Sequence, residues 1–122
     1  MEKIASLGDI ARATFGYHNL NEISEKTGIP KKDVETYYHG LRVPNKMLYS
    51  TENVIKDIKN VWTKREAYNK ARLNVGFDKT KPGSPEEAAL LKVHKKEWDK
   101  MLIDNINTQK ALVEKYNKIK NP

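Results

Sequence analysis

Residues 20–42 read LNEISEKTGIPKKDVETYYHGLR, and this stretch decides the fold of the first half of the chain. Its apolar residues recur at the spacing of two short helices, which Gly28 to Pro30 separate as a tight turn. Gly28 stands where the turn needs a residue that tolerates a positive φ, and Pro30 suits the first turn of a helix. Asn19 followed by Glu22 is a capping pattern that indicates where the first helix begins. The contacts between the two helices would come from Ile23, Ile29, Val34 and Tyr37, with the small Ser24 at their crossing.

Two short helices joined by a tight turn form the unit with which many proteins place one helix in the major groove of DNA. On the second helix, the side chains that point away from the core would be Lys31, Lys32, Glu35, Thr36 and His39. Of these, we predict that Lys31, Lys32, Thr36 and His39 face base edges or phosphates. Any compact three-helix domain also needs amphipathic helices and a glycine turn, so a protein-binding domain remains an alternative.

Both flanks of this stretch are predicted to belong to the same domain. The spacing of Ile4, Leu7, Ile10 and Ala11 predicts a short amphipathic helix that ends near Gly16. After the second motif helix, residues 42–49 read RVPNKMLY, in which Pro-Asn interrupts two short apolar pieces. We predict a small wing of two brief strands there, with Arg42, Asn45 and Lys46 contacting the DNA backbone.

The second half of the chain is predicted to be two long helices. Ser50 and Glu52 open a helix that lasts to about Leu73, and residues 74–83 break the pattern with two glycines and a proline. Ser84 and Pro85 then begin a helix that runs to about Ile119 without glycine or proline. Folded back on the first, this helix would make an antiparallel hairpin.

The apolar stripe of the last helix is longer than one partner helix can cover, which predicts contact with another subunit. The candidate oligomerisation residues are Trp98, Met101, Leu102, Ile106, Val113 and Tyr116. A monomer whose hairpin packs on the N-terminal domain remains the alternative. The expected fold is therefore mainly all-α, with a winged helix-turn-helix over residues 1–60 and a helical hairpin for oligomerisation over residues 61–122.

The net charge of +7 favours a polyanionic partner, although the charge is unevenly distributed. Residues 1–50 carry a net charge of +1 and residues 51–122 a net charge of +6. The chain has no cysteine, its three histidines lack ligand spacing, and its glycines form no phosphate-binding loop. We therefore expect no metal, no cofactor and no enzymatic activity. No apolar run approaches the roughly 18 residues of a membrane span, so we expect a cytoplasmic protein that binds no membrane.

A resemblance extends this interpretation over about residues 19–60. The sequence TGIPKKDVETYYHGL, followed by LYSTENVIKDI, is similar to the winged helix-turn-helix of the MerR and excisionase group. In that group an aromatic closes the recognition helix, Gly-Leu follows, and a Leu-Tyr-Ser-like step leads into a helix with an early valine. The corresponding residues here are Tyr37, Gly40-Leu41, Leu48-Tyr49-Ser50 and Val54. The resemblance implies double-stranded DNA as the partner.

A narrower resemblance includes the second half of the chain. The order of Leu48-Tyr49, Val54-Ile55-Lys56, Lys64-Arg65-Glu66 and Pro82-Gly83-Ser84-Pro85 is similar to that in the lambda-type small terminase subunit of tailed phages. It implies a non-enzymatic homo-oligomer in the host cell cytoplasm that recognises viral DNA for packaging, with the large, catalytic terminase subunit as a further partner. The alternatives are a regulator of the MerR or excisionase type that binds DNA as a dimer, and a protein-binding adaptor.

Overall fold

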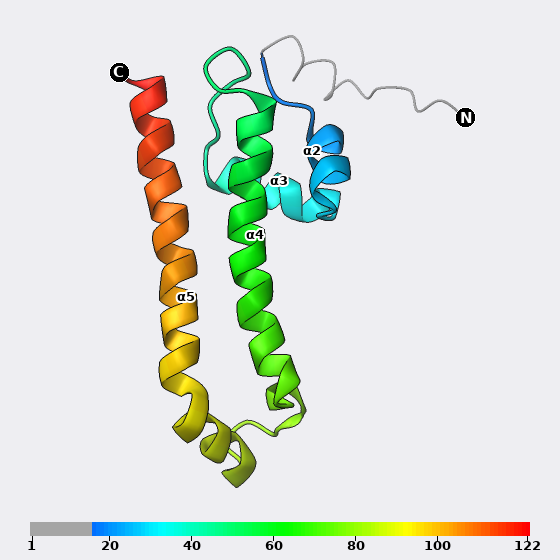
Figure 1. Cartoon of the computed structure of the whole chain (residues 1–122), viewed down its shortest axis with the longest axis vertical. Coiled ribbons are helices and arrows are strands. Elements are labelled where there is room, and N and C mark those ends of the chain that lie inside the picture. Colours follow the sequence, from blue (N-terminus) through cyan, green and yellow to red (C-terminus); the bar gives the residue numbers. More distant parts are fainter. Residues whose placement is uncertain (1–15) are drawn as a thin grey trace, which may run out of the picture. The chain divides into compact units, whose positions relative to one another are not determined.

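A computed structural model of the chain describes residues 16–122 (Figure 1). These residues form four α-helices, namely α2 (Leu20–Thr27), α3 (Lys31–Gly40), α4 (Thr51–Asn74) and α5 (Pro85–Lys120), and one 3-10 turn, η1 (Phe77–Lys79). Residues 16–122 contain no β-strand, so the expectation of a mainly all-α protein is confirmed. The short helix expected to end near Gly16 lies outside the described residues.

Helices α2 and α3 are joined by a turn whose geometry follows from its sequence. Asn19 caps α2, because its side-chain oxygen accepts hydrogen bonds from the backbone N–H groups of Asn21 and Glu22. Gly28 ends α2 with a φ of 75°, and its N–H donates to the carbonyl of Ser24. The Ser24 hydroxyl donates to the carbonyl of Ile29 at 2.6 Å, which ties the turn back onto α2. The predicted helix, glycine turn and second helix are thus confirmed.

The loop between α3 and α4 differs from the prediction. Residues 41–50 form turns, and the two brief strands expected there are not formed. The side-chain oxygen of Asn45 accepts hydrogen bonds from the N–H groups of Met47 and Leu48, at 3.0 and 3.3 Å. Those amides are therefore not available to pair across a hairpin, and Pro44 has no N–H to offer. The Asn45 side chain therefore takes up backbone amides that strand pairing in a wing would use.

The chain divides into two compact units. One contains the described residues up to Asn60 together with Ala111–Pro122, and the other contains Val61–Lys110. Helices α4 and α5 each contribute residues to both units. The expected domains were residues 1–60 and 61–122, whereas in the structure Ala111–Pro122 belongs with the first unit. We call the first the α2–α3 unit and the second the 61–110 unit.

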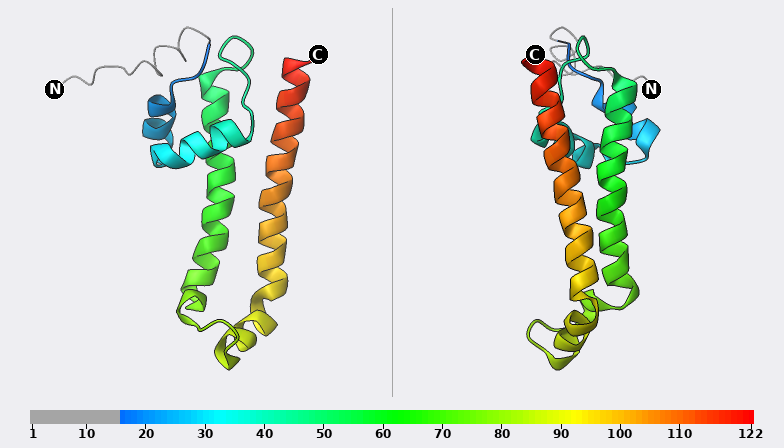
Figure 2. Two further views of the ribbon diagram at one scale, coloured as in Figure 1. Left: turned by 180° about the vertical axis from the view of Figure 1, so that it is seen from behind. Right: turned by 60° about the vertical axis from the view of Figure 1, so that its left-hand side comes forward.

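The α2–α3 unit has a closed apolar core. Helix α3 lies across the N-terminal part of α4 (Figure 2), and the residues between these helices and the end of α5 are almost inaccessible to solvent. All four motif residues predicted to be apolar contacts are buried. The buried apolar side chains of this unit are Leu20, Ile23, Ile29, Val34, Tyr37, Tyr38, Leu41, Tyr49, Val54, Ile58, Leu112 and Tyr116.

The 61–110 unit pairs the later part of α4 with the earlier part of α5. Its described buried residues are Val61, Trp98 and Asn105, and the Asn105 amide donates to the carbonyl of Val61 at 3.0 Å. Lys64 on α4 contacts Asp104 and Thr108 on α5. Helix α5 begins as predicted, since the Ser84 hydroxyl accepts a hydrogen bond from the N–H of Glu87.

Candidate nucleic-acid interface

Helix α3 presents one polar face to solvent. Val34, Tyr37 and Tyr38 are buried, so the turns of the helix leave Lys32, Thr36 and His39 exposed on the opposite face. Lys31 and Glu35 are half-exposed at its edge. The four residues predicted to read DNA therefore lie on accessible positions of one helix. The Thr36 hydroxyl donates a hydrogen bond to the carbonyl of Lys32 at 3.0 Å.

Four cations that were predicted to contact DNA lie on α3 and on the loop that follows it. Within residues 16–122, no ion pair joins Lys31, Lys32, Arg42 or Lys46 to a carboxylate. The residues of the loop between α3 and α4 that were predicted to contact DNA, namely Arg42, Asn45 and Lys46, are all exposed. Helix α3 and this loop thus carry every predicted DNA contact within the α2–α3 unit.

Arg42 has an unusual backbone conformation. Its φ of 57° is the only positive value among the described residues other than glycine. This left-handed conformation destabilises a residue that has a side chain by about 1 kcal/mol, whereas glycine adopts it without strain. The Arg42 carbonyl accepts a hydrogen bond from the Lys120 ammonium at 2.8 Å, which helps to hold the conformation. The Arg42 side chain is exposed, so its guanidinium is accessible to solvent.

The buried side chain of His18 holds the loop between α3 and α4 in place. Its ring is fully buried, with Nδ1 at 2.8 Å from the Thr51 hydroxyl and Nε2 at 3.2 Å from the carbonyl of Pro44. Because the carbonyl can only accept, Nε2 carries the proton and Nδ1 accepts from Thr51 in the neutral ring. Burial lowers the pKa of His18 below its ordinary value. This histidine is therefore a structural tie between the loop and the start of α4, a role that its sequence context did not reveal.

A second polar cluster ties the end of α5 to the loop. The hydroxyls of Tyr49 and Tyr116 both donate to Oδ2 of Asp57, and the Lys115 ammonium donates to Tyr49 at 2.7 Å. Burial, followed by the hydrogen bond to Asp57, raises the pKa values of both tyrosines, so their hydroxyls remain protonated donors. Sequence reasoning missed this cluster, because Asp57 reads as a solvated residue of an amphipathic helix.

The six predicted oligomerisation residues fall into three environments. Trp98 and Tyr116 are buried by other residues of the same chain, and Trp98 stacks on His94 and meets Phe77 edge-on. Met101 and Val113 are half-buried. Leu102 and Ile106 are about two-fifths exposed, at 40% and 41%, and Ile103 beside them is 55% exposed. Leu102, Ile103 and Ile106 are thus one part of the accessible apolar surface of the 61–110 unit, which also includes Leu73, Val75 and Val93.

Neither a metal cluster nor a membrane-spanning helix accompanies this interface in the described part of the chain. Among residues 16–122, no group of three or more histidine, aspartate or glutamate side chains could hold a metal ion. None of the helices in that range is both long and apolar enough to cross a membrane. Comparison of the chain with family models, with curated proteins and with solved structures gives no match.

Proposed function

We propose that the chain is a non-enzymatic subunit that binds double-stranded DNA through α3 and the loop that follows it. The observation that carries this proposal is the exposed face of Lys32, Thr36 and His39 on a helix that a capped, glycine-ended partner helix holds in place. In this proposal the α2–α3 unit is a winged helix-turn-helix in which the short loop takes the place of the wing. Lysines and Arg42 contact phosphates, while Thr36 and His39 meet base edges in the major groove.

The role we propose is recognition of viral DNA for packaging, as in the small terminase subunits that the sequence resembles. The order of the sequence motifs on both sides of the break at residues 82–85 supports it. In this proposal α4 and α5 form an antiparallel hairpin that assembles subunits, so that several weak DNA contacts act together. The exposed apolar residues Leu102, Ile103 and Ile106 are suited to that assembly.

Salt-dependent DNA binding by two double variants tests the proposal. If Lys31 and Lys32 contact phosphates, replacing both with alanine should weaken binding and lower the slope of log K against log salt by up to about two. If Thr36 and His39 meet base edges, replacing both with alanine should reduce the preference for the selected site and leave the slope unchanged. Fluorescence anisotropy with a selected duplex and a scrambled duplex measures both quantities.

The matched control is the replacement of Lys92 and Lys96 with alanine, which removes two exposed lysines one turn apart on α5. This control should keep the preference for the selected site. Unchanged binding and slope in the α3 variants, with intact folding, would remove α3 from the interface and favour a protein-binding adaptor.

The oligomeric state distinguishes packaging from regulation. A ring or larger assembly on DNA supports a terminase subunit, and a dimer supports a regulator of the MerR or excisionase type. Light scattering should show an oligomer for the natural chain and dissociation for Leu102→Asp. A monomer at high micromolar concentration would overturn the assembly role while leaving DNA binding open to its own test.

A further inference from the structure

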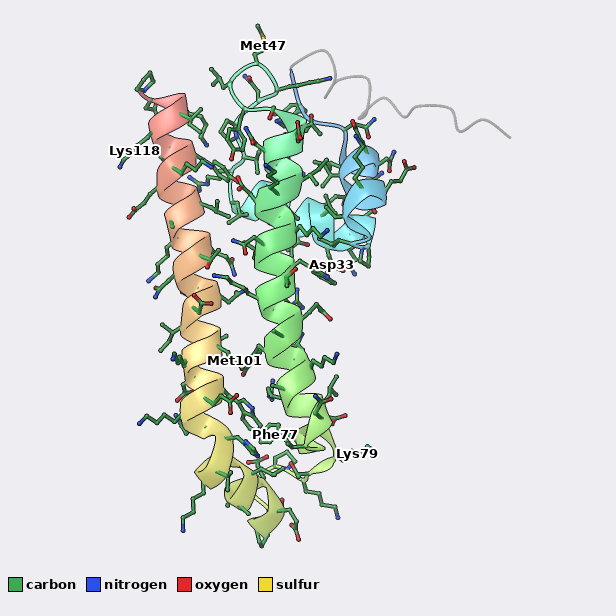
Figure 3. The ribbon with its side chains drawn as sticks, viewed as in Figure 1. Asp33, Met47, Phe77, Lys79, Met101 and Lys118 are labelled. Carbon is green, nitrogen blue, oxygen red and sulfur yellow. The ribbon has the colours of Figure 1, made fainter. Side chains whose placement is uncertain are left out.

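The loop between α3 and α4 exposes two large apolar side chains at its tip. Met47 is 90% exposed and Leu48 is 52% exposed, whereas Pro44, three residues before Met47, and Tyr49, directly after Leu48, are buried. Figure 3 shows Met47 at the outer end of the loop, with its side chain pointing away from the helices. At this exposure Met47 gains almost no hydrophobic free energy on folding, and it would gain some if a partner covered it.

The loop that carries this tip is held at several points. The N–H of Lys46 donates to the carbonyl of Gly16 at 2.6 Å, and the Asn45 side chain fixes the amides of Met47 and Leu48. At the start of the loop, the Lys120 ammonium donates to the Arg42 carbonyl. At its end, the Lys115 ammonium donates to the Tyr49 hydroxyl. The tip is therefore presented by a preorganised turn, which lowers the entropic cost of inserting it into a partner.

The charge around the tip indicates the partner. Residues 41–50 include Arg42 and Lys46 and contain no aspartate or glutamate. A partner that matches an apolar tip on a loop with two cations and no acid has negative charge beside an apolar surface. The groove of duplex DNA has this arrangement, since phosphates line its edges and stacked bases lie inside.

We propose that Met47, supported by Leu48, enters a groove of the bound duplex and wedges against a base step, bending the DNA. Such apolar wedges partly unstack one step and kink the duplex, and the bend allows more protein surface to reach phosphates. The inference rests on the proposed DNA binding, to which it adds a residue that carries no charge. Lys46, next to Met47 in the chain, and Arg42, at the start of the loop, would contact phosphates.

A bending assay tests the wedge. A short duplex labelled at its two ends reports bending as a rise in energy transfer when the full chain saturates it. Met47→Ser should remove most of this rise and weaken binding about ten-fold, because the burial of the methionine side chain is lost. The salt slope should stay unchanged, since methionine releases no counterion, whereas Lys46→Ala should lower that slope by about one.

Two variants serve as controls. Met47→Leu keeps an apolar side chain and should retain most of the bend. Val93→Ser alters another solvent-exposed apolar residue, in the 61–110 unit, where Val93 is 73% exposed, and should leave bending unchanged. The high exposure of Met47 means that the serine variant should fold as the natural chain does, which circular dichroism can check.

Three results would overturn the wedge. If the natural chain binds DNA without a change in energy transfer, the proposed function stands and the wedge fails. The same holds if Met47→Ser binds and bends as the natural chain does, and a loss of chain–chain association in that variant would then assign the tip to a protein contact. If the natural chain binds no duplex at all, the proposed function fails and the wedge fails with it.

Discussion

The two units of the chain bury their apolar residues to very different degrees. The α2–α3 unit covers apolar side chains from four helices and the segments between them, and side-chain hydrogen bonds close its ends. The 61–110 unit consists of two α-helical segments and the short turn η1, buries Val61, Trp98 and Asn105, and leaves Leu73, Val93 and Ile103 exposed. Two packed helices offer each side chain few neighbours, so a large part of an apolar stripe stays in contact with water.

This difference assigns a task to each unit in the proposed function. A closed core fixes the positions of the exposed polar side chains on α3, which reading a DNA groove requires. An open apolar face can be covered by a second copy of the chain, which suits assembly. Substitutions that affect the two units unequally would therefore sharpen the distinction, and substitutions that affect them equally would remove it.

The largest effect is expected where the α2–α3 unit is most tightly packed. Tyr116 is fully buried, so Tyr116→Ala should lower the free energy of unfolding by about 3–5 kcal/mol. Val93→Ala, in the 61–110 unit, should change it by less than about 0.5 kcal/mol, since Val93 is exposed. Urea unfolding followed by circular dichroism measures both values. Similar losses in the two variants would abolish the contrast between the units.

Acidification should weaken the α2–α3 unit through His18. Burial lowers its pKa in the folded state, so the unfolded chain binds the proton more tightly. Its contribution to stability is complete above the ordinary histidine pKa of about 6.5 and is lost as the pH falls below that value. The loss can reach at most about 1.4 kcal/mol per pH unit.

The variant His18→Gln should flatten this pH dependence, because glutamine does not titrate. His39→Gln is the matched control, since His39 is exposed and should leave the dependence in place. Denaturant midpoints between pH 7.5 and pH 5 give the comparison. An equally steep decline in the His18 variant would show that another group is responsible.

Removal of one N-cap in each unit makes the same kind of change in both, which sharpens the comparison. Asn19→Ala removes the cap of α2, and Ser84→Ala removes the cap of α5, each at a cost of about 1 kcal/mol. Trp62 and Trp98 both lie in the 61–110 unit, so tryptophan fluorescence reports that unit. We expect Ser84→Ala to shift the fluorescence transition more than Asn19→Ala does. The opposite order would mean that the units do not unfold as separate bodies.

A small effect on stability is expected at Arg42. Arg42→Gly removes the cost of the left-handed conformation but adds the entropy of glycine to the unfolded chain, so stability should change by less than about 1 kcal/mol. If Arg42 contacts a phosphate, DNA affinity should fall and the salt slope should drop by about one. A large loss of stability with unchanged DNA binding would make Arg42 a structural residue.

The elements that were predictable from sequence are those whose signals are local. Gly28, Asn19 and Ser84 act on backbone groups within a few residues, and each ends or begins a helix as predicted. The break after Asn74 follows from its glycines and proline in the same way. Such signals are independent of what packs against the helix, which is why the sequence alone is enough to predict them.

The features that escaped prediction depend on partners far along the chain. The apolar stripe of α5 predicts that Trp98 and Tyr116 are buried, yet it carries no information on whether the chain itself or another subunit covers them. The acceptor role of Asp57 depends on Tyr49 and Tyr116, which lie 8 and 59 positions away. In the loop, the Asn45 side chain accepts hydrogen bonds from amides that the strands of a wing would need. The strand propensities of the residues do not include such a side-chain bond, so the missing strands could not be predicted from them.

In the proposed function, α3 and its following loop form the DNA interface, rather than the more basic second half of the chain. Titrating the full ¹⁵N-labelled chain with a duplex, and following every backbone amide by NMR, tests this assignment most directly. We predict the largest shifts among residues 31–48, with smaller, salt-sensitive changes in the 61–110 unit. Large shifts confined to the 61–110 unit, with the amides of α3 unmoved at saturation, would contradict it.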